Sequence, residues 1–388
     1  MNFNQINSRK QSRSIKWDTH VANHIHPDAI PMWVADMDFK TLPDITEALH
    51  KEVESGIYGY SYESDDYFNA VMGWMHRRHQ WELQKEWIYT TPGVVSALNA
   101  CIRVLAKEHE AVLIQEPVYY PFKRSILANN RVAISNPLIL KKGHYEIDFN
   151  DFEQKIVTHQ VKAFILCNPH NPVGRVYTKD ELNRMVDICQ KYAVTIISDE
   201  IHMDFVFKPH HHYVLQALRK DYADHIITLS AASKTFNLAA FKVSQLICSN
   251  ADTLQAIKKE YSQLGMHGHN TLGLLSTEVA YSQGDIYVDE LVHYIQKNGE
   301  TLRTYLSHHL PHIKLIEPEG LYLVWLDFSA LNLSQEELKT FLSEEAHLWL
   351  NDGSSFGEGG EGFMRMNLAT PQSELLKALD RLKAALKV

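Results

Sequence analysis

Three side chains with useful chemistry follow consecutive apolar segments of the sequence. Asn171, Asp199 and Lys234 supply an amide, a carboxylate and an amine, and each comes just after a short apolar run. Taken singly, Asn171 is typical of a turn, Asp199 of a helix cap and Lys234 of a solvated surface. In an open α/β sheet, however, ligands bind beyond the carboxyl ends of the strands. The three residues together therefore indicate one small-molecule site.

Alternating strand and helix patterns surround these side chains. The predicted strands are residues 111–115, 161–167, 193–199, 225–230 and 244–248. The predicted helices between them are residues 94–108, 119–130 and 178–192. The last helix has a clear start, because Thr178 can cap it and Glu181 completes a capping box. This order is typical of the α/β class, in which a mostly parallel sheet lies between helices.

The pattern changes after residue 284. The further predicted helices are residues 286–310, 334–346 and 373–386, and the further predicted strands are residues 320–328 and 363–369. We therefore expect a large ligand-binding domain over residues 47–284 and a smaller α+β domain over residues 285–388. Residues 1–46 hold no strong helix pattern and are expected to associate with the small domain. The small residues at 351–357 predict a mobile entrance loop.

Charge and composition argue against several classes of protein. Lys and Arg number 38 against 47 Asp and Glu, a net charge of −9, so nucleic acid and anionic membranes are poor partners. No segment approaches the roughly 18 apolar residues of a spanning helix, and residues 1–17 lack a signal-peptide core, so we expect a cytoplasmic protein. Four widely spaced cysteines favour reduced core thiols. We predict no metal site, and we interpret His210, His211 and His212 as a solvated loop.

The order and spacing of the strand-end residues resemble those of the fold-type-I pyridoxal-phosphate enzymes, the aspartate aminotransferase superfamily. The resemblance covers nearly the whole chain and implies a seven-stranded sheet in the large domain. It implies that Lys234 binds pyridoxal 5′-phosphate (PLP) covalently and acts as a base, and that Asp199 pairs with the ring nitrogen. It further implies that Asn171 bonds the ring 3-oxygen, that His202 lies near that oxygen, and that Tyr119 stacks on the ring.

The same resemblance implies a binding site for the cofactor phosphate. The amides of Val94 and Val95 would face the phosphate from a helix N-terminus, and Ser233 and Lys242 would add a hydroxyl and a cation. The chain departs here from the better-known aminotransferases, which have serine and arginine where this sequence has Ala231 and Lys242. Lysine cannot bind two phosphate oxygens as a fork, so other groups must contribute more.

Two further residues match the family, one that would bind the substrate and one that would reach the cofactor of a second subunit. Arg365 matches the arginine that holds the substrate α-carboxylate. A guanidinium on a buried strand needs a carboxylate partner, either the substrate's or one in the protein, and we favour the substrate. Tyr60 lies in a loop with Gly56 and Gly59 and matches a tyrosine that reaches the cofactor phosphate of a neighbouring subunit. The resemblance therefore implies a homodimer with shared active sites.

Three longer strings narrow the resemblance to one branch of the superfamily. Residues 32–39 (MWVADMDF), 58–60 (YGY) and 198–204 (SDEIHMD) resemble the cystathionine β-lyases and cysteine-S-conjugate lyases, a branch that includes the maltose-regulon modulator protein. The implied reaction is α,β-elimination to pyruvate, ammonia and a thiol, in which Lys234 or Tyr60 protonates the leaving thiolate. The preferred thioether or thiol stays open.

Two other hypotheses remain at this point. An aminotransferase would use the same residues but would need a keto-acid acceptor. A regulatory protein could bind a protein partner through its surface and keep the cofactor site incidentally, or an enzyme could carry such a role in addition. The intact set of Lys234, Asp199, Asn171 and Arg365 favours an enzyme.

Overall fold

A seven-stranded sheet forms the centre of the computed structural model, which describes residues 1–266 and 268–387. Its strands, in spatial order, are β2 (Ile88–Thr91), β10 (Ser244–Ile247), β9 (Ile226–Ser230), β8 (Thr195–Asp199), β7 (Ala163–Cys167), β3 (Ala111–Ile114) and β4 (Val132–Ser135). The strand β10 runs antiparallel to both neighbours, and the other pairs are parallel. The predicted α/β class and the five predicted strands are confirmed, and β2 and β4 are additions.

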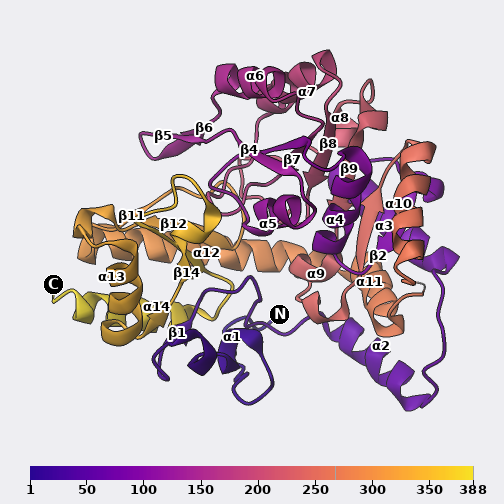
Figure 1. Cartoon of the computed structure of the whole chain (residues 1–388). Helices are drawn as coiled ribbons and strands as arrows, with labels where there is room; N and C mark the ends of the chain where they lie inside the picture. Colours follow the sequence, from indigo (N-terminus) through magenta and orange to yellow (C-terminus); the bar gives the residue numbers. More distant parts are fainter. Residues whose placement is uncertain (267, 388) are drawn as a thin grey trace.

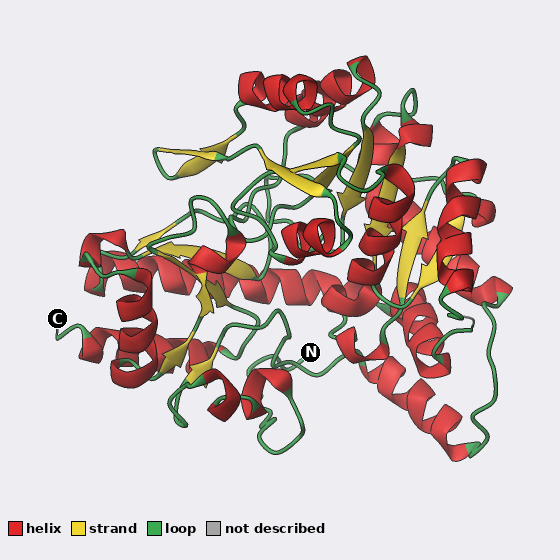
Figure 2. Cartoon of the chain, viewed as in Figure 1, coloured by secondary structure: helices red, strands yellow, loops and turns green. Residues whose placement is uncertain are grey.

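Helices cover both faces of this sheet (Figures 1 and 2). One face packs against α4 (Val94–Leu105), α5 (Pro121–Ala128) and α10 (Ala251–Gln263), and the other against α6 (Phe149–Thr158), α7 (Lys179–Lys191) and α8 (Leu215–Leu218). Alternate strand residues feed the two cores, with Ile165 and Ile197 on one face and Phe164 and Ile196 on the other. The predicted capping box of Thr178 and Glu181 is present at the start of α7.

A second, four-stranded antiparallel sheet lies toward the C-terminus. Its strands are β11 (Lys314–Leu315), β12 (Leu323–Asp327), β15 (Phe363–Asn367) and β14 (Asn351–Asp352), and the neighbouring helices are α13 (Gln335–Thr340) and α14 (Gln372–Ala385). The long helix α12 (Asp285–His309) runs between the two halves of the molecule (Figure 1). Tyr287 and Leu291 near its start join one core cluster, whereas Leu302 and Leu306 near its end join another.

The N-terminal segment contacts both halves. Its elements are α1 (Ile15–Asp18), β1 (Ile30–Pro31) and α2 (Pro43–Glu54). The strand β1 pairs with β13 (Leu348–Trp349). The helix α2 packs on α11 (Thr271–Gln283), which also packs on α3 (Asp65–His79). Elsewhere in the chain, the structure has the hairpin β5 (Ile139–Lys141) and β6 (His144–Glu146), the short helix α9 (Ala232–Thr235) and several short 3-10 turns. Pairing of β1 with β13 ties this segment to the C-terminal sheet, while the domain boundaries at residues 46 and 284 stay a prediction.

The structure tests several smaller expectations. All four cysteines are free and buried, which confirms the core-thiol interpretation. Within residues 1–266 and 268–387, no helix is long and apolar enough to cross a bilayer, and no group of three or more His, Cys, Asp or Glu side chains is arranged to hold a metal. The solvated-loop interpretation is wrong for His212, which is buried with its Nε2 2.9 Å from Glu200 Oε2. The buried Glu200 carboxylate needs such a partner.

The small residues at 351–357 serve close packing. Gly353 and Phe356 are buried, and the backbone N–H of Val118 donates to the Phe356 carbonyl at 2.9 Å. Gly357 has a φ of +97°, and a Cβ there would collide with the Glu116 carboxylate. Glycine is therefore required at this position by backbone conformation and by space, while the mobility expected of the segment stays a prediction.

Candidate active site

A cavity of about 410 Å³ lies where the ends of β7, β8 and β9 meet the start of α4, residues 33–35 and the strand β15. Ten of the predicted site residues line it: Val94, Val95, Tyr119, Asn171, Asp199, His202, Ser233, Lys234, Lys242 and Arg365. Parallel strands bring their carboxyl ends to one edge of the sheet, which explains why residues far apart in sequence meet here. Tyr60 does not line this cavity.

The amine of Lys234 has few polar partners. Its Nζ donates to the Ala35 carbonyl at 2.9 Å, and no ion pair to it occurs among the described residues. Burial lowers the pKa of Lys234, Asp36 and Asp199 oppose that shift, and Arg365 adds to it. A lowered pKa raises the fraction of neutral amine, the form that acts as a nucleophile or base.

Asp199 and His202 are both held away from their charged forms. Burial raises the pKa of Asp199 to about 7, although the Ile201 N–H donates to its Oδ1 at 3.2 Å. Burial lowers the pKa of His202 to about 3, and Lys234 and Arg365 add to that effect. The buried Nδ1 of His202 has no hydrogen-bond partner among the described residues. Unpaired groups of this kind are costly unless a ligand completes them.

Helix α4 supplies an anion-binding end to the cavity. The helix starts at Val94 directly after Gly93, whose φ of +116° favours glycine. A Cβ at Gly93 would meet nothing within 4 Å, so the backbone faces open space at this point. The first N–H groups of a helix have no carbonyl partner within it, and they carry partial positive charge. Ser233 and the exposed Lys242 line the same cavity.

Arg365 projects from β15 with its hydrogen bonds incomplete. Its Nη1 donates to Asn171 Oδ1 at 3.0 Å and its Nη2 to the Trp33 carbonyl at 2.8 Å, while its buried Nε has no partner. Burial lowers the pKa of Arg365 to about 10. No carboxylate forms an ion pair with it among the described residues, so the alternative of a structural ion pair loses its support. The guanidinium can still receive a ligand carboxylate.

Several lining residues escaped the sequence argument. Tyr120, Cys167 and Asn351 also line the cavity. Asn351 is opposite Arg365 in the pairing of β14 with β15, a relationship that strand pairing creates and residue spacing does not reveal. Tyr120 directly follows Tyr119, and this was the one feature of the sequence that could have placed Tyr120 at the cavity.

Tyr60 lies on the surface of its own chain. The loop between α2 and α3 leaves it fully exposed, and Ile57, Tyr58 and Tyr62 beside it are also exposed. Its assignment to the site of a neighbouring subunit therefore stays a prediction. Large exposed apolar groups gathered in one loop are typical of an interaction surface.

Comparison with known proteins places the chain in a family. A family model for aminotransferases of class I and II matches residues 27–382. The chain belongs to that family. Cystathionine beta-lyase PatB from Bacillus subtilis is 40% identical over 386 residues, which cover 100% of both chains.

Two solved structures extend this similarity to the fold. Cystalysin from Treponema denticola, whose structure contains a pyridoxal 5′-phosphate cofactor, superposes with a TM-score of 0.96 at 37% identity and covers 100% of this chain and 98% of its own. The PLP-bound C-S lyase from Staphylococcus hominis has a TM-score of 0.93 at 31% identity, again covering 100% of this chain and 98% of its own.

Proposed function

We propose that this protein is a PLP-dependent carbon-sulfur β-lyase. It would split cystathionine, cysteine or another cysteine S-conjugate into pyruvate, ammonia and a thiol or sulfide. The observation that carries the proposal is one cavity that holds Lys234, Asp199, Asn171 and Arg365 in a chain similar to cystathionine beta-lyase PatB along its whole length.

The residues that line the cavity fit PLP. The unpartnered Nδ1 of His202 offers a hydrogen bond where the ring 3-oxygen would lie, and the start of α4 offers backbone N–H groups to a phosphate. A protonated ring nitrogen would favour the ionised form of Asp199, whose pKa burial raises to about 7. When bound, PLP supplies the electron sink that stabilises a carbanion at Cα.

The chain's own residues would divide the remaining work. Arg365 binds the α-carboxylate through its free guanidinium edge and so fixes the orientation of the amino acid. Lys234, with its lowered pKa, takes the Cα proton on Nζ as general base. Asp199 is buried and Lys234 half-buried, which limits the access of water to the proton-transfer step. Either Lys234 or the Tyr60 of a second copy of the chain returns a proton to the leaving thiolate.

A homodimer is part of the same proposal. The exposed loop with Tyr58, Tyr60 and Tyr62 is a surface suited to a second copy of the chain. Tyr60 would then complete the phosphate end of the partner's cavity, where Lys242 supplies a point charge in place of a forked arginine.

One assay separates the lyase from an aminotransferase. Holoenzyme is incubated with cystathionine, with cysteine and with alanine, each without any keto acid, and pyruvate and free thiol or sulfide are measured. A lyase forms pyruvate and thiol in equal amounts from the sulfur substrates and none from alanine. Turnover that requires an added keto acid would identify an aminotransferase instead.

A further inference from the structure

Residues 33–35 line one wall of the cavity, the chain continues from them through residues 36–39, and two backbone carbonyls of this segment hold side chains of the cavity. The Trp33 carbonyl accepts from Arg365 Nη2 at 2.8 Å, and the Ala35 carbonyl accepts from Lys234 Nζ at 2.9 Å. A shift of this segment would therefore change the direction in which the guanidinium and the amine point.

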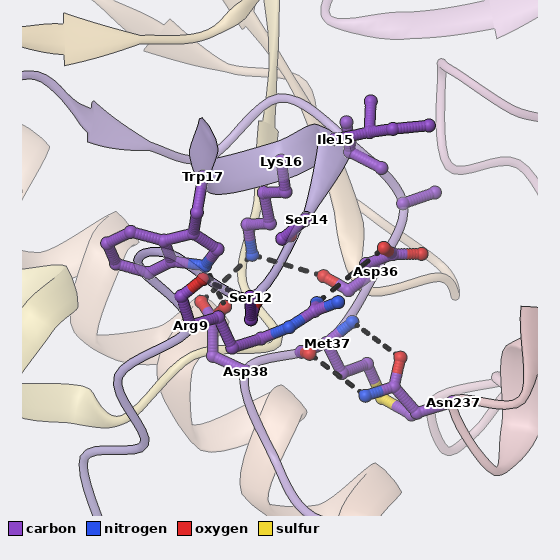
Figure 3. Close-up of polar contacts among 12 residues, drawn as sticks. Arg9, Ser12, Ser14, Ile15, Lys16, Trp17, Asp36, Met37, Asp38 and Asn237 are labelled. Carbon is purple, nitrogen blue, oxygen red and sulfur yellow. Dashed lines mark hydrogen bonds and ion pairs between the residues drawn. The ribbon is translucent and has the colours of Figure 1, made fainter. Parts of the chain in front are cut away.

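Lys16 holds this segment from outside the cavity. Its side chain is 1% exposed, and its Nζ lies 2.9 Å from Asp38 Oδ2 and donates to the Asp36 carbonyl at 3.1 Å (Figure 3). The indole Nε1 of Trp33 donates to the Lys16 carbonyl at 3.3 Å, and Trp17 Nε1 lies 3.2 Å from Asp38 Oδ1. Lys16 thus contacts the segment at three points without lining the cavity.

Two asparagines brace the same segment from other directions. Asn367, two residues after Arg365 on β15, donates to the carbonyls of residues 34 and 36 at 2.7 and 2.8 Å. Asn237, three residues after Lys234, accepts from the Met37 N–H at 3.1 Å and donates to the Met37 carbonyl at 3.0 Å. These amides form neutral hydrogen bonds, whereas Lys16 provides a buried charge-assisted contact, which is the stronger kind.

We propose that Lys16 is a positioning residue for substrate binding. The pair with Asp38 and the bond to the Asp36 carbonyl keep residues 33–39 against the cavity, and the Trp33 carbonyl keeps Arg365 aimed at the substrate carboxylate. Loss of Lys16 leaves the Asp38 carboxylate buried without a cation, so the segment moves to hydrate it and Arg365 loses a partner. The inference rests on the proposed binding of an amino-acid α-carboxylate at Arg365.

A comparison of Lys16→Met with Arg103→Met tests the proposal in the holoenzyme. Arg103 also forms an ion pair, at 2.6 Å to Glu260, but its partners Glu260 and Asn129 do not line the cavity. We expect Lys16→Met to raise KM about tenfold through the misplaced Arg365, and to lower kcat as well wherever the Ala35 carbonyl no longer orients Lys234. A purely stabilising role would lower the amount of active enzyme and leave KM unchanged, which would overturn the proposal.

A double variant separates positioning from stability. Lys16→Met with Asp38→Asn removes the stranded charge and should recover much of the lost thermal stability. The raised KM should persist, because the Asp36 carbonyl has lost the bond from Lys16 and keeps only the one from Asn367. Recovery of both stability and KM would overturn the proposal.

Amide hydrogen exchange gives a result that does not depend on the reaction. In the Lys16→Met holoenzyme, the peptide over residues 33–39 should exchange faster than in wild type or Arg103→Met, and equal protection would overturn the proposal. If the protein proves to be an aminotransferase, KM is measured for its amino-acid substrate instead. The proposed lyase function can therefore fail while the role of Lys16 is still decided.

Discussion

Two lysines donate to adjacent carbonyls of the same segment, but only one of them forms an ion pair. Lys16 donates to the Asp36 carbonyl and pairs with Asp38 at 2.9 Å, whereas Lys234 donates to the Ala35 carbonyl and forms no ion pair among the described residues. Burial therefore lowers the pKa of Lys234. Around this one segment, the paired charge stabilises the fold, whereas the unpaired amine faces the cavity and is available to a ligand.

The largest difference between the two lysines should be in catalysis. Lys234→Ala should lower elimination activity by roughly 10²–10⁴-fold or more, the usual scale for a general base, because cofactor attachment and proton abstraction both depend on this amine. The thermal stability of the cofactor-free variant should be unchanged or higher, since a half-buried and poorly paired amine is lost. The exposed Lys208 provides a matched control, and Lys208→Ala should retain full activity. Normal pyruvate formation by Lys234→Ala would remove this lysine from the mechanism.

Tyr60 extends the comparison to a side chain that is fully exposed on its own chain. Lys234→Ala and Tyr60→Ala should each be inactive as homodimers. After dissociation and reassociation of a mixture, one of the two sites in each mixed dimer contains both wild-type residues, so activity should return. Pyruvate release is the measurement, and sedimentation confirms the dimer. A confirmed mixed dimer without activity, or an active monomer, would contradict shared sites.

A substitution of Arg365 tests whether its incomplete set of hydrogen bonds is completed by the substrate carboxylate. Arg365→Lys keeps the charge but loses the fork that bonds Asn171 and the Trp33 carbonyl. We expect KM to rise about tenfold, the scale of one hydrogen bond to a charged group, with a smaller change in kcat. Arg303→Lys, at an exposed pair with Glu317, is the control. An unchanged KM for Arg365→Lys would mean that another group binds the carboxylate.

The sequence predicted the residues that line the cavity, but it did not predict the buried ion pair of Lys16 and Asp38. Asn171, Asp199 and Lys234 follow apolar strands, and periodicity locates strand ends well. Lys16 and Asp38 meet through the path of an irregular N-terminal segment, for which no periodic pattern exists. Contacts made by backbone carbonyls, such as that of Ala35 with Lys234, are independent of residue type and leave no mark in the sequence.

The errors have physical causes of the same kind. The strand β4 is short, with one exposed and three half-buried residues, and its apolar run is only three residues long. The burial of His212 depends on Glu200, whose need for a partner arises only after β8 has placed it in the core. The close contact of Gly357 with Glu116, which lies far away in the sequence, likewise could not be read from spacing, although it is not an error of prediction.

The smallest predicted effect concerns the stability of the cofactor-free protein. Burial raises the pKa of Asp199 from 3.8 to about 7. Between those values the folded protein keeps a proton that the unfolded chain has released, so this group lowers stability progressively as the pH rises from 3.8 to about 7, and fully above that. The amide of Asp199→Asn cannot ionise, so the stability of this variant does not fall with pH for this reason.

Asp199→Asn should therefore be more stable than wild type, by about 1–2 kcal/mol at about pH 8, within the range of mutations that relieve a functional site. The difference in the free energy of unfolding should shrink toward about pH 5, because the folded wild type is then protonated. Urea denaturation of the cofactor-free proteins measures it, with the exposed Asp28→Asn as control. Lys16→Met should lose stability under the same conditions, because it strands a buried carboxylate. Equal losses in both variants would mean that Asp199, like Asp38, is a structural carboxylate, and the contrast between paired and unpaired groups would fail.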